Sequence, residues 1–247
     1  MELVHYVVDG PLATITLDSP HNRNALSKQL VTELFGHLQA AAADDEVRVV
    51  LITSSGKVFC SGADLSEATA DGMEEGARRI VELQRLIVSM DKPVVVRAYG
   101  AVRAGGIGIV AAADIAVANE SATFALTEVK LGLAAAIISL TVHHRMDPRA
   151  AALTTLGGEV FSGADAAAYG LVTTAVPDDA IDERVAELCR SLATGAPQGL
   201  RESKRILNAD LIARIDAKGA EMAALSARLF ASDEARESMT AFLSRKK

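Results

Sequence analysis

The chain has 247 residues with 25 Lys and Arg against 32 Asp and Glu, a formal net charge of −7 at pH 7. Half of the residues are hydrophobic and 23% are charged, so the chain can bury a large core and is neither disordered nor collagen-like. The net negative charge speaks against nucleic acid as the main ligand, because proteins that follow a phosphate backbone usually present a basic face.

The two cysteines predict a reducing compartment. Cys60 and Cys189 are too few for a disulfide framework and lack the paired spacing of a zinc site, so we expect both thiols in the core and no metal. No apolar run reaches the roughly 20 residues of a membrane span. The N-terminus lacks the basic region and continuous apolar block of a signal peptide. We therefore expect a soluble, cytoplasmic protein that contacts no membrane.

The first elements in chain order are a β-hairpin and a helix. Two alternating, β-branched segments, Leu3–Val8 and Leu12–Leu17, flank Asp9-Gly10, a dipeptide that is typical of tight turns. Ser27 suits the N-cap of the helix, in which leucines recur at helical spacing as far as the acidic pair at 44–45.

Strands then alternate with helices, which indicates a parallel or mixed α/β sheet. The continuous apolar runs Val47–Thr53 and Pro93–Ala98 have the length of strands that are buried on both faces. The other elements predicted in this part of the chain are a helix over Glu74–Met90, a helix over 105–113, and short strands over Ile115–Ala118 and Thr123–Leu126.

Helical patterns dominate after residue 135, interrupted by a strand-like segment over Leu171–Val176. From Pro197 to Ser244 the pattern predicts about three amphipathic helices, with breaks near Asp210 and at 232–233. Residues 197–247 contain ten Lys and Arg and seven Asp and Glu, a net +3, which leaves −10 on residues 1–196. The basic tail either meets another subunit or an anionic ligand, or consists of solvated helix faces.

Three glycine-containing or polar loops follow predicted strands, where α/β proteins bind ligands. In the first loop, Ser54–Leu65, Gly62 permits a sharp turn that would direct the amides of Ala63 and Asp64 towards a ligand. The alternative is an ordinary turn that is capped by Asp64.

The second and third loops offer free amides and a carboxylate. In Tyr99–Ile115 the glycine pair at 105–106 precedes a helix, whose first amides would bind an anion unless the glycines only serve close packing. In Phe124–Leu133 a single carboxylate, Glu128, lies between apolar flanks. Such a carboxylate either has a raised pKa and a catalytic role or is paired, for example with Lys130.

Several familiar motifs fit the chain poorly. Residues 106–111 match the dinucleotide pattern G-x-G-x-x-A, but they stand several residues beyond the preceding strand and no first βαβ unit precedes them. Lys57 lacks the flanking residues of a P-loop, and no G-x-S-x-G elbow occurs. His143 and His144 are adjacent, so they point to different sides of a helix and are poor joint metal ligands.

Five blocks of the sequence stand out together: HNRNALS at 21–27, GKVFCSGADLSE at 56–67, KPVVVRAYGAVRAGGIGIVAAADIAVA at 92–118, FALTEVKLGL at 124–133 and GAPQGLRESKRIL at 195–207. In this order, over essentially the whole chain, they resemble the crotonase or enoyl-CoA hydratase/isomerase family. The resemblance implies a spiral of ββα units that makes two sheets, with an α/β core over 1–194 and a helical region over 195–247 that forms a trimer, often a hexamer.

The resemblance also implies the substrate and the site. Members of the family bind acyl-CoA thioesters and stabilise an enolate with two backbone amides, which match Ala63 and Gly105 here, while Glu128 matches a catalytic acid/base. CoA is part of the substrate, and no further cofactor or metal is implied. The residues expected to bind the substrate are Arg23, Ser61, Ala63, Asp64, Leu65, Ser66, Gly105 and Gly108, with a basic C-terminal helix of a neighbouring subunit as a further contact to the CoA phosphates.

The chain departs from the family pattern at one catalytic position. Typical hydratases hold water between two glutamates, and the first of these matches Gly108, which can neither orient water nor exchange a proton. Glu128 alone suits double-bond isomerisation. The surrounding blocks, however, resemble a bacterial branch similar to methylglutaconyl-CoA hydratase that also has glycine there. A hydratase is our main hypothesis, and an isomerase or a weakly active acyl-CoA-binding protein remain alternatives.

Overall fold

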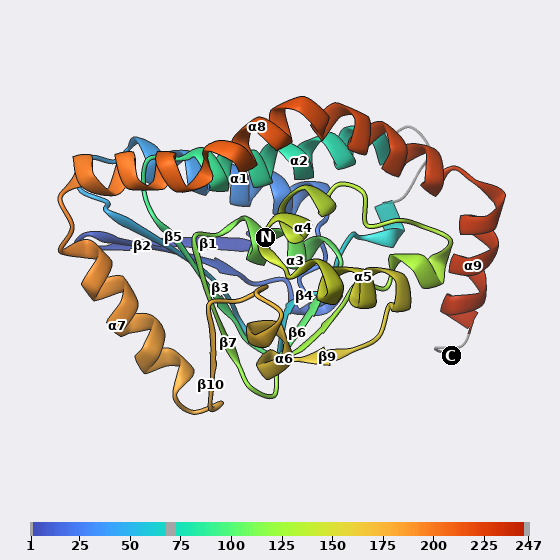
Figure 1. Ribbon diagram of the computed structural model, residues 1–247, viewed down its shortest axis with the longest axis horizontal. Helices are drawn as coiled ribbons and strands as arrows, with labels where there is room; N and C mark the ends of the chain where they lie inside the picture. Colours follow the sequence, from blue (N-terminus) through green and yellow to red (C-terminus); the bar gives the residue numbers. More distant parts are fainter. Residues whose placement is uncertain (1, 68–72, 245–247) are drawn as a thin grey trace.

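The computed structural model describes residues 2–67 and 73–244 (Figure 1). The strands are β1 (Val4–Asp9), β2 (Leu12–Leu17), β3 (Val49–Ser54), β4 (Val58–Cys60), β5 (Val94–Ala98), β6 (Ala101–Arg103), β7 (Ile115–Asn119), β8 (Thr123–Ala125), β9 (Phe161–Ser162) and β10 (Thr174–Val176). The α-helices are α1 (Lys28–Ala43), α2 (Met73–Ser89), α3 (Gly105–Ala112), α4 (Ser139–Arg145), α5 (Pro148–Gly157), α6 (Gly163–Ala168), α7 (Ile181–Ala193), α8 (Pro197–Phe230) and α9 (Asp233–Ser244). Three short 3₁₀ helices are η1 (Pro20–Asn22), η2 (Leu65–Glu67) and η3 (Glu128–Leu131).

Two strands and a helix recur along the chain, and the two strands of a unit divide between two sheets. The six-stranded sheet has the order β1-β2-β3-β5-β7-β10, and the four-stranded sheet has the order β4-β6-β8-β9. Each of the units that begin at β3, β5 and β7 thus places its first strand in the large sheet and its second in the small one. The expected α/β class and the spiral of ββα units are confirmed.

The β1–β2 hairpin and the start of α1 follow the local sequence signals that predicted them. In the β1–β2 hairpin Val4 pairs with Leu17 and Asp9 with Leu12, and Gly10 in the turn has a φ of +53°. The Ser27 side chain accepts a hydrogen bond from the Leu30 amide at 3.3 Å and so caps α1. The hairpin and the cap are both confirmed.

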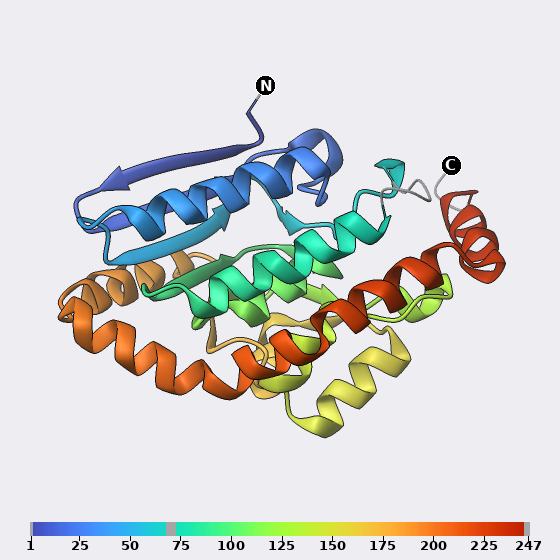
Figure 2. The same cartoon turned by 90° about the horizontal axis from the view of Figure 1, so that it is seen from above.

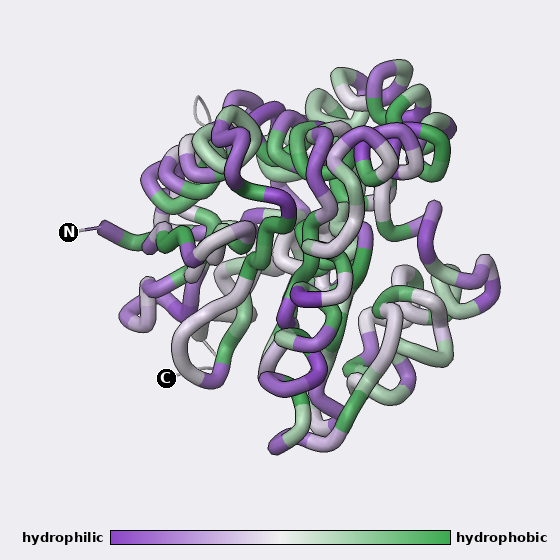
Figure 3. Tube along the Cα trace, turned by 90° about the vertical axis from the view of Figure 1, so that its left-hand side faces the viewer, coloured by the Kyte–Doolittle hydropathy of each residue, from purple (hydrophilic) through white to green (hydrophobic). Residues whose placement is uncertain are grey.

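The large sheet is the middle of three layers. Helices α1, α2 and α8 cover one face and α7 covers the other (Figure 1). Along β3 the side chains alternate between these layers, since Val50 and Ile52 belong to the main core while Val49 packs with Val185 of α7. Hydrophobic residues accordingly concentrate along the central strands and alternate with hydrophilic ones along the outer helices (Figure 3).

The C-terminal helices differ from the prediction. Helix α8 runs without interruption for 34 residues along α2, and the break near Asp210 is wrong because this residue is exposed and an exposed Asp costs a helix little (Figure 2). The break at 232–233 is confirmed, since α9 begins there and packs against η3. Within the described ranges no helix is both long and apolar enough to cross a membrane.

Helix α8 is fixed to the body by a buried cation. The ammonium of Lys204, 5% exposed, lies 2.7 Å from Oδ2 of Asp114 and donates to the carbonyls of Ile87 and Lys92 at 2.8 and 2.9 Å. Desolvation lowers the pKa of Lys204, although the Asp114 carboxylate acts to raise it. Because Asp114 follows α3 and Lys204 lies on α8, this pair joins the C-terminal helix to the ββα spiral.

Candidate active site

The small sheet brings the three predicted loops together. Strands β4, β6 and β8 are parallel neighbours, in which Cys60 pairs with Val102 and Arg103 with Ala125. The catalytic candidates Ala63, Gly105 and Glu128 follow the last residues of these strands by three, two and three positions. Since the carboxyl ends of parallel strands lie at one edge of a sheet, the three candidates share that edge.

Close backbone contacts hold the first two loops against each other. A Cβ atom built on Gly62 would lie 2.9 Å from Cβ of Ala104, and Gly62 has a φ of +93°, so a side chain at position 62 is excluded on both grounds. Ala104 itself has a φ of +46°, which is unusual for a residue with a side chain. The Ala104 amide lies 3.4 Å from the carbonyl oxygen of Ala125, which joins the second loop to the third.

Leu26 lies between the two candidate amides, and the sequence analysis did not single it out. Its amide donates to the Gly62 carbonyl at 2.8 Å, and it forms a parallel bridge with Ala63. Its Cδ1 atom is 2.6 Å from the place that a Cβ on Gly105 would take. In the described part of the chain neither the Ala63 nor the Gly105 N–H finds an acceptor, so both amides are free to donate to a ligand.

Glu128 is the first residue of η3 and has an unsatisfied carboxylate. Its Oε2 atom is inaccessible to water and has no hydrogen-bond partner among the described residues. Burial raises the pKa of Glu128 to about 7, although its own backbone N–H acts in the opposite direction. Lys130 instead lies 3.4 Å from a carboxylate oxygen of Glu159, so the alternative pairing with Glu128 is wrong. At neutral pH the Glu128 carboxyl populates both protonation states, as an acid/base group requires.

Residues expected to bind CoA meet beside this edge, with Arg23 and Ser66 exposed and Ser61 half-buried. The Ser61 amide donates to the carbonyl of Arg23 at 3.1 Å, and the Ser61 hydroxyl donates to the carbonyl of Asn22 at 3.1 Å. Arg23 is exposed, and its backbone has the left-handed conformation, with a φ of +59°. The loop before α1 and the loop after β4 are thus fixed to each other, with the Arg23 side chain on the surface.

Asp64 closes the same loop with its side chain. One carboxylate oxygen accepts from the amide and hydroxyl of Ser66 at 3.0 and 2.6 Å, and the other accepts from Nδ2 of Asn22 at 3.0 Å. Burial acts to raise the pKa of Asp64, but these hydrogen bonds outweigh it and lower the pKa. The predicted capped turn is confirmed, and it leads into η2 at Leu65.

Gly108 lies in the buried middle of α3, and the space beside it is filled. A Cβ atom on Gly108 would lie 2.5 Å from Cγ2 of Ile138 and 3.3 Å from Oε1 of Gln84. The fully buried Gln84 accepts from the Thr141 hydroxyl at 2.6 Å and donates to the Ile137 carbonyl at 3.1 Å. Gly108 therefore marks a packed contact between α3 and its neighbours, and no local pattern predicted either partner.

The glycine pair at the start of α3 allows close packing and leaves one amide unpaired. A Cβ on Gly106 would lie 2.6 Å from Cβ of Cys60, so this glycine allows close packing of α3 on β4. Gly105 begins the helix with its amide unpaired. Cys60 is buried as predicted, and burial raises the pKa of its thiol to about 12.

The spiral of ββα units presents two unpaired backbone amides and one buried carboxyl at one edge of its small sheet, and comparison with known proteins identifies the family. Residues 9–247 match the sequence profile of the family described as Enoyl-CoA hydratase/isomerase. The chain belongs to this enzyme family.

Individual relatives are similar to this chain over nearly its whole length. It is 45% identical to an enoyl-CoA hydratase from Mycobacterium avium of known crystal structure, with a TM-score of 0.92 over 98% of this chain and 96% of that one. It is 28% identical to the 2,3-dehydroadipyl-CoA hydratase of Escherichia coli K12 over 234 residues, which is 94% of this chain and 92% of that protein.

Proposed function

We propose that the protein adds water to an enoyl-CoA thioester, or removes it, through an enolate held by the amides of Ala63 and Gly105, with Glu128 moving the proton. One observation carries this proposal. A carboxyl with a pKa of about 7 and an unsatisfied oxygen follows β8 at the same sheet edge as two backbone donors without acceptors.

Backbone donors suit a thioester oxygen because they are fixed before negative charge develops on it. Removing one preorganised donor to such an oxyanion costs roughly 3 kcal/mol in the transition state. In hydration, ionised Glu128 takes a proton from water as the hydroxyl adds to the β carbon. The thioester oxygen carries the resulting charge until protonated Glu128 returns the proton to the α carbon. Water is thus divided over the two carbons and Glu128 is regenerated.

Double-bond isomerisation is the second candidate, and the surroundings of Gly108 favour it. Ile138 and Gln84 fill the space beside that position, so among the described residues this side of α3 offers no second carboxylate to hold a water. Glu128 alone would then take a proton from one carbon of a 3-enoyl-CoA and return it two carbons along the chain. The two candidates differ in the source of the proton, which is water in hydration and a carbon of the substrate in isomerisation.

The contact between the loop at Arg23 and the loop of residues 61–66 supports CoA as the carrier of the acyl group. We place the adenine and pantetheine along the loop from Ser61 through Asp64 and Leu65 to Ser66, with Arg23 near a phosphate. We also propose a trimer or a dimer of trimers, in which the net positive C-terminal region of a neighbouring subunit approaches the CoA phosphates. No cofactor other than the CoA of the substrate takes part in this scheme.

The assay follows the conjugated enoyl-thioester absorbance. Purified protein is incubated with crotonyl-CoA, with 3-methylglutaconyl-CoA and with a 3-enoyl-CoA. Loss of absorbance with either of the first two supports hydration, and a gain with the third supports isomerisation. Binding of all three without turnover would overturn both candidates in favour of an acyl-CoA-binding protein.

Two matched variants test the role of Glu128. Glu128→Gln is expected to lower kcat by about 10²- to 10⁴-fold, the usual contribution of general acid–base catalysis. Glu159→Gln, an exposed carboxylate that pairs with Lys130 from outside the site, should leave kcat unchanged. Full activity of Glu128→Gln would show that another group moves the proton.

A further inference from the structure

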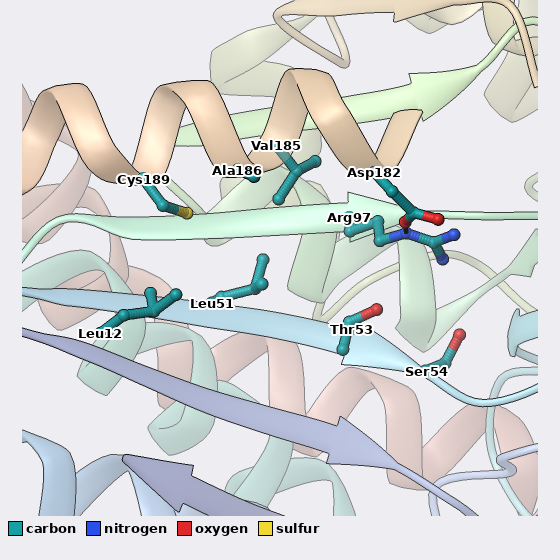
Figure 4. Close-up of a pocket in the computed structure, with 9 residues that line it drawn as sticks. All are labelled: Leu12, Leu51, Thr53, Ser54, Arg97, Asp182, Val185, Ala186 and Cys189. Atoms are coloured by element: carbon teal, nitrogen blue, oxygen red, sulfur yellow. Dashed lines mark hydrogen bonds and ion pairs between the residues drawn. The ribbon is translucent and has the colours of Figure 1, made fainter. Parts of the chain in front are cut away.

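A cleft of about 360 Å³ lies between α7 and the outer face of the large sheet. Residues of β2, β3, β5 and α7 line it (Figure 4), and none of them belongs to the site proposed above for acyl-CoA. Its volume is within the range of pockets that hold small molecules. The inference drawn from it does not depend on the proposed function.

One end of the cleft is polar and centred on Arg97. The Arg97 side chain is only 17% exposed, and its Nε donates to a carboxylate oxygen of Asp182 at 2.6 Å. Its guanidinium carbon lies 4.9 Å from the ring centre of Tyr99, which fixes the plane of the group. No described residue accepts a hydrogen bond from the two terminal nitrogens, so the end of the guanidinium is free to bind an anion.

One hydroxyl, that of Thr53, lies at the same end, as Figure 4 shows. It makes no hydrogen bond with a described residue, and it points to the side on which Arg97 lies. Ser54, the next residue of β3, pairs with Leu17 of the main core, so its side chain lies on the other face of the sheet. The polar end of the cleft thus offers an anion the terminal nitrogens of Arg97 and the Thr53 hydroxyl.

The other end of the cleft is apolar. Leu12 and Leu51 of the sheet face Ala186 and Cys189 of α7 there, and the Cys189 thiol behaves as a small hydrophobic group (Figure 4). From Asp182 to Cys189 the lining extends over two turns of one helix face, about 10 Å. The cleft thus has the form of a slot with a cationic end and a hydrophobic length.

We propose that this slot binds a small aliphatic carboxylate of about six carbons. The carboxylate accepts hydrogen bonds from the terminal nitrogens of Arg97 and from the hydroxyl of Thr53. The chain lies along the leucines and α7. An amine of the same length is not favoured, because its one anionic partner, Asp182, is 79% exposed and already accepts from Arg97.

The test is a titration of the full-length protein with hexanoate, followed by NMR of its alanine and leucine methyl groups. Hexanoate is expected to shift the methyl of Ala186 with a Kd in the millimolar range or below, while hexylamine leaves it unshifted. Leu26 reports on the acyl-CoA site in the same spectrum. Shifts at Leu26 without shifts at Ala186, or equal binding of hexylamine, would overturn the proposal.

Three variants distinguish this site from a nonspecific apolar contact. Arg97→Gln and Thr53→Val should each weaken hexanoate binding by tenfold or more, while Arg190→Gln, an exposed position on α7, should not change it. Thr53→Val keeps the β-branched shape and removes a hydroxyl that has no partner among the described residues, so the variant is expected to fold as stably as the parent. Unchanged binding in both Arg97→Gln and Thr53→Val would refute the assignment.

Discussion

Glu128→Gln should change the stability of the protein in a way that depends on pH. Burial raises the pKa of this carboxyl from its ordinary value of 4.5 to about 7, so between these two pH values the folded state binds more protons at Glu128 than the unfolded state does. The stability of the parent protein therefore falls, relative to the amide variant, as pH rises through this window. Glutamine has nearly the same shape and stays neutral throughout.

The size of the effect follows from the two pKa values. The difference between the unfolded-state pKa of 4.5 and the folded-state pKa of about 7 lowers the free energy of unfolding by at most about 3 kcal/mol, since one pKa unit is about 1.4 kcal/mol. At pH 5 most of this difference is absent, so the carboxylate costs the parent less than about 1 kcal/mol. At pH 8 both carboxyls, folded and unfolded, are ionised and nearly the whole 3 kcal/mol applies.

Urea unfolding measures the difference directly. The chain has no tryptophan, so unfolding is best followed by circular dichroism, for both proteins, at pH 5 and pH 8 and at one fixed protein concentration. The free energy of unfolding of Glu128→Gln, relative to that of the parent, is expected to be about 2 to 3 kcal/mol higher at pH 8 than at pH 5. An equal stability difference at pH 5 and pH 8 would refute the reasoning that this carboxyl is buried and unpaired.

Three further predictions concern packing and burial. Gly108→Ala should cost about 1 to 3 kcal/mol because its methyl group meets Cγ2 of Ile138 at 2.5 Å, and adding Ile138→Ala should recover part of this in a double-mutant cycle; simple additivity would argue against the contact. Lys204→Met should cost about 3 to 5 kcal/mol in urea unfolding because it leaves the Asp114 carboxylate without its cation, and a loss below 1 kcal/mol would contradict that pairing. Cys60, fully buried and with a pKa of about 12, should react with a disulfide reagent at pH 8 only as fast as the protein opens, whereas rapid labelling would mean that the loop after β4 is accessible.

Regular elements with a strong local pattern could be predicted from the sequence. The β1–β2 hairpin has its turn dipeptide, α1 has its capping serine, and β3 and β5 are apolar runs that only burial on both faces explains. The small sheet could not be predicted in this way, because β4 and β6 have three residues each and owe their existence to pairing with strands about 40 and 20 residues further along the chain.

The same limit holds for the candidate site: residues with a distinctive local pattern could be predicted, and residues placed by distant contacts could not. Glu128 could be selected because a lone carboxylate between apolar residues usually has either a functional role or a charged partner. In the structure one of its oxygens has no hydrogen-bond partner among the described residues. Leu26 and Ile138 could not be selected, since an apolar side chain gives no sign of which backbone it lies against. The unbroken length of α8 was missed because one acidic residue in a helix is uninformative when that residue faces water.

The close approach of Gly62 to Ala104 has a consequence for how this chain tolerates mutation. In the proposed mechanism Ala63 offers a ligand its main-chain N–H, which every residue except proline carries, whereas Gly62 must keep both its left-handed backbone and its missing side chain. In a saturation library, position 63 should therefore accept many residues and position 62 almost none. Ala63, which contacts the ligand in the proposed mechanism, would then look dispensable, and Gly62, which does not contact it, would look essential.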